Sequence, residues 1–160
     1  MNPMRMLYIH GLEGTSQGVK AQLLHNLFPE MLIPDFSGDL ETRMAALEAI
    51  LGTQTGWLLV GSSFGGLMAA LFATQHPARV RRLVLLAPAL IWPTFASQLP
   101  SPIDVPTVIF HGRQDAIVPI DIVQKLAQQV FTNLEFNAVE DDHGLYKTIH
   151  ELDWKTILAT

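Results

Sequence analysis

Cysteine is missing from the 160-residue sequence. Its absence excludes disulfide bonds, thiolate metal sites and a cysteine nucleophile. Disulfides are rare in the cytoplasm, so a chain without cysteine is compatible with that compartment.

Charged residues are few, and basic residues are the scarcer kind. Lys and Arg total 10 against 15 Asp and Glu, which gives a formal charge of −5. A protein that binds nucleic acid needs a basic face to neutralise phosphates. We therefore expect no nucleic-acid partner.

Long apolar segments are also absent. The longest run, residues 83–92, contains Pro88 and is too short to cross a bilayer. Residues 1–6 lead directly into a predicted strand and lack the apolar stretch and cleavage site of a signal peptide. We therefore expect no membrane span and a cytoplasmic location.

Hydrophobic residues are abundant, at 49% of the chain. This share favours a compact fold with a large buried interior over disorder. A length of 160 residues is close to the commonest domain size. The sequence therefore predicts one domain over residues 1–160.

Short apolar runs alternate with amphipathic stretches along the chain. The predicted strands are 6–10, 31–34, 57–60, 83–86, 107–110 and 134–139, and the predicted helices are 18–27, 40–51, 64–75, 120–130 and 145–159. The strand runs are continuously apolar, which is typical of strands covered by helices on both faces. We therefore predict an α/β fold, a three-layer α/β/α arrangement around a mostly parallel sheet of about six strands.

One long segment, residues 87–105, has neither the pattern of an amphipathic helix nor that of a continuously apolar strand. It contains Pro88, Pro93, Pro100 and Pro102. Loops of this length are often functional. The segment is too short to hold a separate lid, so we expect no cap domain.

Residues 61–65 read Gly-Ser-Ser-Phe-Gly between a predicted strand and a predicted helix. This G-x-S-x-G pattern is typical of a sharp strand-to-helix turn that exposes the central serine above the sheet. The glycines on either side remove side chains that would clash in so tight a bend. Ser63 is therefore a candidate nucleophile.

Polar residues follow several predicted strands at their carboxyl ends, where open α/β sheets bind ligands. Ser63, Asp115 and His143 each follow a strand and occur in the order nucleophile, acid, base. In such a set His143 takes the proton of Ser63, and Asp115 orients the imidazole. Asp141 and Asp142 are rivals for the acid, and His150, inside a predicted helix, is the rival for the base.

The oxyanion that forms during attack needs two donors. We expect one to be the backbone N–H of Phe64, directly after the nucleophile. The other is expected from Leu12, in the loop after the first strand, where Gly11 lets the backbone approach a substrate closely. His10 is expected to support this loop by hydrogen bonding. His10 and His111 have no partner at ligand spacing, so we expect no metal and no cofactor.

The combined motifs resemble the α/β-hydrolases, in particular small lidless serine carboxylesterases of bacteria. The matching residues are 10–11, 34–38, 61–66, 76–77, 86–88, 111–115, 118–119 and 143–144, which extend over nearly the whole chain. The resemblance implies hydrolysis of an ester, thioester or amide through an acyl-enzyme, with Ser63, Asp115 and His143 as the triad. The chain has no residues for the antiparallel strands that usually open this fold, and its oxyanion loop lacks the triple glycine of lipases.

Apolar residues of the long loop, among them Leu90, Ile91 and Trp92, are candidates for the wall of an acyl pocket or for the contact surface of a homodimer. We expect a small acyl ester or thioester as substrate. Two alternatives remain: a non-catalytic binding protein on the same scaffold, and acyl transfer or carbon–carbon hydrolysis at the same site.

Overall fold

The computed structural model of the protein describes residues 5–159. Its centre is a parallel sheet of five strands in the order β1-β2-β3-β4-β5. The strands are β1 (Arg5–Ile9), β2 (Trp57–Ser62), β3 (Val80–Leu86), β4 (Thr107–Gly112) and β5 (Leu134–Val139). The expected domain of residues 1–160 includes residues 1–4 and 160, which lie outside the described residues.

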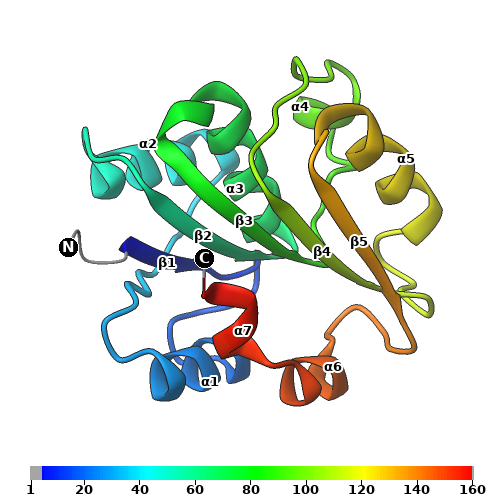
Figure 1. Ribbon diagram of the computed structural model, residues 1–160, viewed down its shortest axis with the longest axis horizontal. Coiled ribbons are helices and arrows are strands. Elements are labelled where there is room, and N and C mark those ends of the chain that lie inside the picture. The colour runs from blue at the N-terminus through cyan, green and yellow to red at the C-terminus, as the bar shows by residue number, and fades with distance from the viewer. Residues whose placement is uncertain (1–4, 160) are drawn as a thin grey trace.

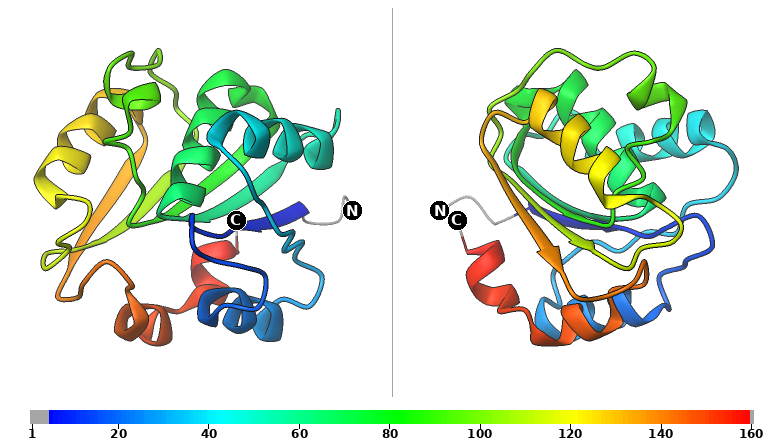
Figure 2. Two further views of the ribbon diagram at one scale, coloured as in Figure 1. Left: turned by 180° about the vertical axis from the view of Figure 1, so that it is seen from behind. Right: turned by 90° about the vertical axis from the view of Figure 1, so that its right-hand side faces the viewer.

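Helices cover both faces of the sheet (Figures 1 and 2). They are α1 (Val19–Leu27), α2 (Leu40–Leu51), α3 (Phe64–Gln75), α4 (Pro93–Ala96), α5 (Ile120–Val130), α6 (Tyr146–Glu151) and α7 (Trp154–Leu158), with a 3-10 turn at Pro77–Arg79. Because the strand order always advances in one direction, crossovers of one handedness place α2, α3 and α5 on the same face. Helices α1, α6 and α7 cover the other face, which gives the predicted three layers.

Two hydrophobic clusters fill the spaces between the layers. On β2, Leu59 packs into the cluster under α2, α3 and α5, whereas Leu58 and Val60 pack into the cluster under α1, α6 and α7. Every residue of β2 is buried. This burial on both faces explains why the strand is continuously apolar instead of alternating. A fully buried strand thus carries Ser63 at its end.

One of the six predicted strands, residues 31–34, does not become a strand of the sheet and forms only a single bridge beside β1. Leu32 pairs with Leu7, and its N–H and C=O bond to Met6 and Tyr8 at 2.9 Å each. Pro34 has no N–H to continue such a ladder. The segment therefore lies along the sheet edge without extending it.

The predicted C-terminal helix of residues 145–159 is wrong as one element, because the chain breaks it into α6 and α7. Leu152 is extended, with ψ of 141°. The Asp153 carboxylate then accepts hydrogen bonds from the Thr156 N–H at 3.3 Å and hydroxyl at 2.7 Å. An aspartate that caps a new helix in this way competes with continuation of the old one.

The long loop after β3 is folded down onto the protein. Within it only the four-residue α4 is helical, and Phe95 of this helix is fully buried. Ile103 then bridges to Phe131 at the end of α5. At the position where a cap would be inserted, the loop therefore packs onto the body of the protein. It leaves the carboxyl ends of the strands uncovered.

In the part of the chain that the structure covers, residues 5–159, none of the helices has the length and apolar character needed to cross a membrane.

Candidate active site

Ser63 stands at the turn between β2 and α3 with a strained backbone. Its φ of 54° is unusual for a residue with a side chain. The Ser63 N–H donates to the Leu86 carbonyl of β3 at 2.9 Å, which ties the turn to the neighbouring strand. A β-carbon at Gly61 or Gly65 would collide with backbone of α3 or of β1. The close approach therefore requires glycine at both positions.

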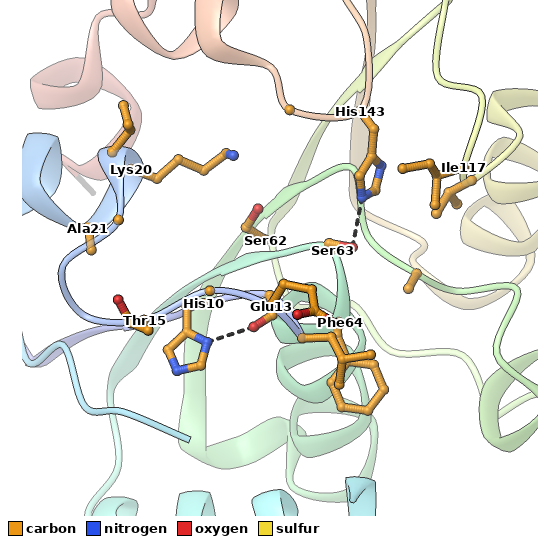
Figure 3. A pocket seen from close by; sticks show the side chains of 18 of the residues that line it. His10, Glu13, Thr15, Lys20, Ala21, Ser62, Ser63, Phe64, Ile117 and His143 are labelled. Carbon is orange, nitrogen blue, oxygen red and sulfur yellow. Dashed lines mark hydrogen bonds between the residues drawn. The ribbon is translucent and has the colours of Figure 1, made fainter. Parts of the chain in front are cut away.

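The side chains of Ser63, His143 and Asp115 form a continuous hydrogen-bonded chain. His143 Nε2 lies 2.9 Å from Ser63 Oγ, and His143 Nδ1 lies 2.8 Å from Asp115 Oδ2. The Asp115 side chain is fully shielded from solvent, whereas that of His143 is 20% exposed. Since a carboxylate only accepts, Nδ1 carries the proton and Nε2 is free to accept one from Ser63. Figure 3 shows the imidazole directly above Ser63.

The second oxygen of Asp115 is held by the backbone of its own loop. Oδ1 accepts from the N–H groups of Ile117 and Val118 at 2.9 and 2.8 Å. These bonds satisfy the buried carboxylate and stop it from rotating away from His143. The residues after β4 therefore orient the acid before any substrate binds.

The two rival acids build the loop that carries His143 and do not bond to it. Asp141 accepts from both the N–H and the hydroxyl of Thr148, and Asp142 accepts from the N–H of Gly144. The rival base, His150, bonds to the Tyr146 carbonyl within α6. Of the candidates considered for acid and base, the structure brings together only Asp115 and His143 with Ser63.

His111 lies fully buried behind Asp115. Its Nε2 is 2.8 Å from the Val118 carbonyl and 3.2 Å from Asp115 Oδ2. Burial lowers the pKa of His111, and the neighbouring Asp115 only partly offsets this effect. The imidazole is therefore neutral and donates its Nε2–H to the Val118 carbonyl, which supports the loop around the acid.

His10 orients the loop after β1. Its Nε2 accepts from the Phe36 N–H at 2.9 Å, so Nδ1 carries the proton and donates to the Gly11 carbonyl at 2.7 Å. The same carbonyl accepts from the Gly14 N–H at 3.1 Å. In a trans peptide the N–H points opposite to the carbonyl. The N–H of Leu12 is therefore turned away from His10.

Two further contacts secure this loop. Buried Arg43 of α2 donates to the Leu12 carbonyl at 3.2 Å and stacks its guanidinium over the Phe64 ring. Asp35 accepts from the backbone N–H of Ser16 at 2.6 Å and from its hydroxyl at 2.9 Å, and these bonds lower the pKa of Asp35. Asp35 thus acts on the loop after β1 and not on the triad.

Gly11 and Phe64 border Ser63 from two sides. A β-carbon on Gly11 would lie 3.6 Å from that of Ser63, so the loop passes directly beside the serine. Phe64 is the first residue of α3, where backbone N–H groups have no acceptor within the helix. The loop after β1 and the first turn of α3 thus both lie beside Ser63.

A cavity of about 590 Å³ opens above Ser63 and His143. Gly11, Ile91 and Trp92 line it, as do Leu12 and Phe64. The Trp92 ring packs edge-on against Phe64, with 5.2 Å between centroids.

The prediction that Leu90 lies in the cavity wall is wrong. It is fully buried in the hydrophobic cluster beneath α3, and it does not line the cavity. The chain turns inward here, because the Leu90 N–H bonds back to the Pro88 carbonyl at 2.8 Å. The side chain therefore points into the core while its two successors reach the cavity.

Sequence reasoning missed the part of the wall that α1 and α6 supply. Lys20 from α1 and Tyr146 from α6 line the cavity, together with Tyr8 and Ser62 of the sheet. Burial raises the pKa of the Tyr8 phenol, which bonds to the Ser62 side chain. Lys20 and Tyr146 belong to no motif, and the packing of α1 against α6 brings these two residues to the site.

Within residues 5–159, no group of three or more His, Asp or Glu side chains is arranged to hold a metal ion.

The parallel sheet, the serine at a strained strand-to-helix turn and the cavity above it define a protein with a hydrolase fold. A family model described as the alpha/beta hydrolase fold matches residues 13–101, more than half of the chain. The chain belongs to this family. A comparison with curated proteins finds no match.

Several solved structures have a similar fold. Alpha/beta hydrolase domain-containing protein 10 from mouse is 19% identical with a TM-score of 0.75, over 96% of this chain and 86% of that one. An alpha-beta serine hydrolase homologue from Coxiella burnetii is 21% identical with a TM-score of 0.77, over 99% and 85%. Est1E from Butyrivibrio proteoclasticus, with ferulic acid bound, is 19% identical with a TM-score of 0.73, over 98% and 91%. The family and its hydrolase members support hydrolase activity in general.

Proposed function

We propose that the protein is a serine hydrolase that cleaves a carboxylic ester or thioester through an acyl-enzyme. The observation that carries this proposal is the hydrogen-bonded chain from Ser63 through His143 to Asp115 at the floor of an open cavity. A serine hydroxyl alone is a poor nucleophile at neutral pH. In the hydrogen-bonded chain, His143 serves as the base for the Ser63 hydroxyl, and the carboxylate of Asp115 orients that base.

In the acylation step, Ser63 Oγ attacks the carbonyl carbon of the substrate while His143 Nε2 accepts the hydroxyl proton. The carbonyl oxygen becomes negative and accepts hydrogen bonds from the N–H groups of Leu12 and Phe64. The imidazolium of His143 is stabilised by Asp115 through the 2.8 Å bond. It then protonates the leaving alcohol or thiol as the carbon–oxygen or carbon–sulfur bond breaks.

Deacylation repeats the sequence with water as the nucleophile. His143 removes a proton from water, the hydroxide oxygen attacks the acyl carbon, and the proton returns to Ser63 Oγ as the acid leaves. The 20% exposure of His143 supports entry of that water from the cavity side.

The mouth of the cavity favours substrates with apolar groups. Leu12, Val19, Trp92, Ile117 and Tyr146 surround it, and each is at least 41% exposed. Exposed apolar residues around a concave site are typical of a surface that binds an apolar ligand. Within residues 5–159 the cavity above Ser63 lies open, and we propose small to medium acyl groups as the accepted class.

The first test is hydrolysis of 4-nitrophenyl acetate and butyrate by the wild type and by Ser63→Ala. We expect the substitution to lower kcat by about 10⁴-fold or more, because the nucleophile is removed. Thr94→Ala, at a hydroxyl residue in α4 beyond the cavity wall, is the control and should retain activity. Equal rates for wild type and Ser63→Ala would contradict the proposal.

A fluorophosphonate probe separates this function from that of a non-catalytic binding protein. An activated serine forms a covalent adduct with the probe, which mass spectrometry locates at the residue. We expect the adduct at Ser63 in the wild type and its loss in His143→Ala. Absence of labelling in the wild type would favour the binding protein.

A further inference from the structure

Lys20 enters the cavity from the first turn of α1, and nothing in the proposed mechanism uses it. Its ammonium group makes no hydrogen bond and no ion pair with any of residues 5–159; its one close partner is the Tyr146 ring, with Nζ 4.7 Å from the centroid. Figure 3 shows the side chain extended toward Ser62, on the opposite side of Ser63 from Ile117. A cation therefore lines one side of the cavity, while the mouth of the cavity is largely apolar. We call this side, formed by Lys20 and the start of α1, the arm of the cavity.

The two acidic residues whose charges act on Lys20 bond to other groups. Asp141 accepts from Thr148, and Asp142 accepts from Gly144, both within the loop that holds His143. Burial lowers the pKa of Lys20, while the two aspartates oppose that change and favour the ammonium form. Their charge thus favours the ammonium form, although neither aspartate forms an ion pair with Lys20 among residues 5–159.

The N-terminus of α1 adds positive potential to the same arm. This nine-residue helix begins after Gly18, which has no side chain to cap it, and its first turn contains no acidic residue. The first N–H groups of a helix have no acceptor within it and carry the positive end of its dipole. Gly18, Val19 and Lys20 all line the cavity. Two independent features therefore favour an anion at this place.

We propose that this arm binds a carboxylate carried by the substrate, so that the preferred ester has an acid group on its acyl or its alcohol part. The inference rests on the proposed function and assigns a substrate class to it. One lysine and one helix N-terminus match the single charge of a carboxylate. The apolar mouth receives the rest of the substrate, which makes the expected ligand an amphipathic acid ester.

The experiment uses esters that differ only in charge. The mono-4-nitrophenyl ester of adipic acid is paired with the 4-nitrophenyl ester of adipamic acid, which places the acid or its neutral amide on the acyl side. 4-Acetoxybenzoate is paired with 4-acetoxybenzamide, which places the acid or its neutral amide on the alcohol side. We expect wild type to prefer the acid in at least one pair by about tenfold in kcat/KM, as a charge-assisted hydrogen bond allows.

Substitutions at Lys20 assign the preference to this residue. Lys20→Met should abolish it by lowering kcat/KM for the acid about tenfold while the amide changes less than about threefold. Lys20→Arg should retain part of it. The matched control is Lys147→Met, which removes the same charge from exposed α6 near Asp141 but outside the cavity. Equal acid-to-amide ratios in wild type and Lys20→Met would overturn the inference.

Binding measured without turnover keeps the two proposals distinguishable. Calorimetry of adipate and of 4-hydroxybenzoate with Ser63→Ala should show a Kd at least about tenfold lower than with the double variant Ser63→Ala, Lys20→Met for one of the two acids. Failure of the proposed function shows as no turnover of any ester that depends on Ser63. Failure of the carboxylate site shows as equal Kd values in this comparison, whatever the turnover.

Discussion

His10 Nδ1 donates a 2.7 Å hydrogen bond to the carbonyl oxygen of Gly11, the residue that passes beside Ser63. This bond sets the direction of the peptide between residues 11 and 12, and through it the direction of the Leu12 N–H. His10 is buried and its other nitrogen is occupied by the Phe36 N–H, so the ring is held in one tautomer. A side chain outside the triad thereby prepares one of the two proposed oxyanion donors.

His10→Phe should lower kcat for 4-nitrophenyl acetate by about 10²-fold with little change in KM, because an oxyanion donor loses its orientation while substrate contacts remain. Steady-state kinetics measure both constants, and circular dichroism verifies folding. His25→Phe, at an exposed histidine of α1, is the control. A rise in KM with unchanged kcat would show that His10 affects binding instead.

Asp115→Asn should lower kcat by about 10³-fold or more, because an amide cannot stabilise the imidazolium and permits the wrong tautomer of His143. Asp142→Asn is the matched control, since its side-chain oxygen still accepts from the Gly144 N–H. It should stay within about threefold of wild type. If the two variants lost activity equally, the loss would not be specific to Asp115, and its assignment as the acid would be contradicted.

Hydrolysis should rise between about pH 5 and pH 8. The reason is that protonated His143 cannot accept the Ser63 proton. The pH dependence of kcat/KM for 4-nitrophenyl acetate measures this in free enzyme. A flat profile over that range would argue against His143 as the base.

Stability should fall as the pH drops below about 6.5, the ordinary pKa of histidine. Burial lowers the pKa of His111 in the folded protein, so below 6.5 the unfolded chain binds a proton that the folded one does not. The stability is complete above the unfolded pKa and is lost toward the folded one. Thermal unfolding at pH 7 and at about pH 5 should show a smaller decrease for His111→Gln than for wild type. The exposed His25→Gln should retain the wild-type decrease.

Trp92→Ala should lower kcat/KM about tenfold for 4-nitrophenyl hexanoate and less than threefold for the acetate. The ring lines the cavity and packs on Phe64, so its removal takes away apolar contact that only a longer acyl chain uses. Leu99→Ala, at another exposed apolar residue of the same loop, is the control. An equal loss for both esters would place Trp92 outside the acyl-binding wall.

Much of the fold is predictable from local pattern. Helices α2, α3 and α5 begin and end at the predicted residues, because each has a clear apolar face or run and a recognisable stop. Asp39 caps α2 by accepting from the Thr42 N–H at 2.8 Å. Strand β3 starts at Val80, three residues before the predicted start, because Arg81 and Arg82 interrupt the apolar run that marked it.

The C-terminal helix shows where local pattern is insufficient. The apolar residues within 145–159 recur with the period of a helix. The backbone nevertheless turns at Leu152, and the Trp154 indole donates to the Ile149 carbonyl at 2.8 Å. Such a turn follows from packing against the sheet, which outweighs helix propensity.

The sequence by itself determined the reactive elements: the glycines that permit the Ser63 turn, and the strand ends from which Asp115 and His143 emerge. These depend on backbone sterics and on the parallel sheet, both of which short-range pattern specifies. The tertiary structure alone decided that Leu90 turns into the core and that Lys20 reaches the cavity. Lys20 lies beside Tyr146 only because α1 and α6, far apart in the sequence, pack on one face of the sheet. Such long-range packing has no signature in a single sequence, and it is what places the Lys20 ammonium group in this site.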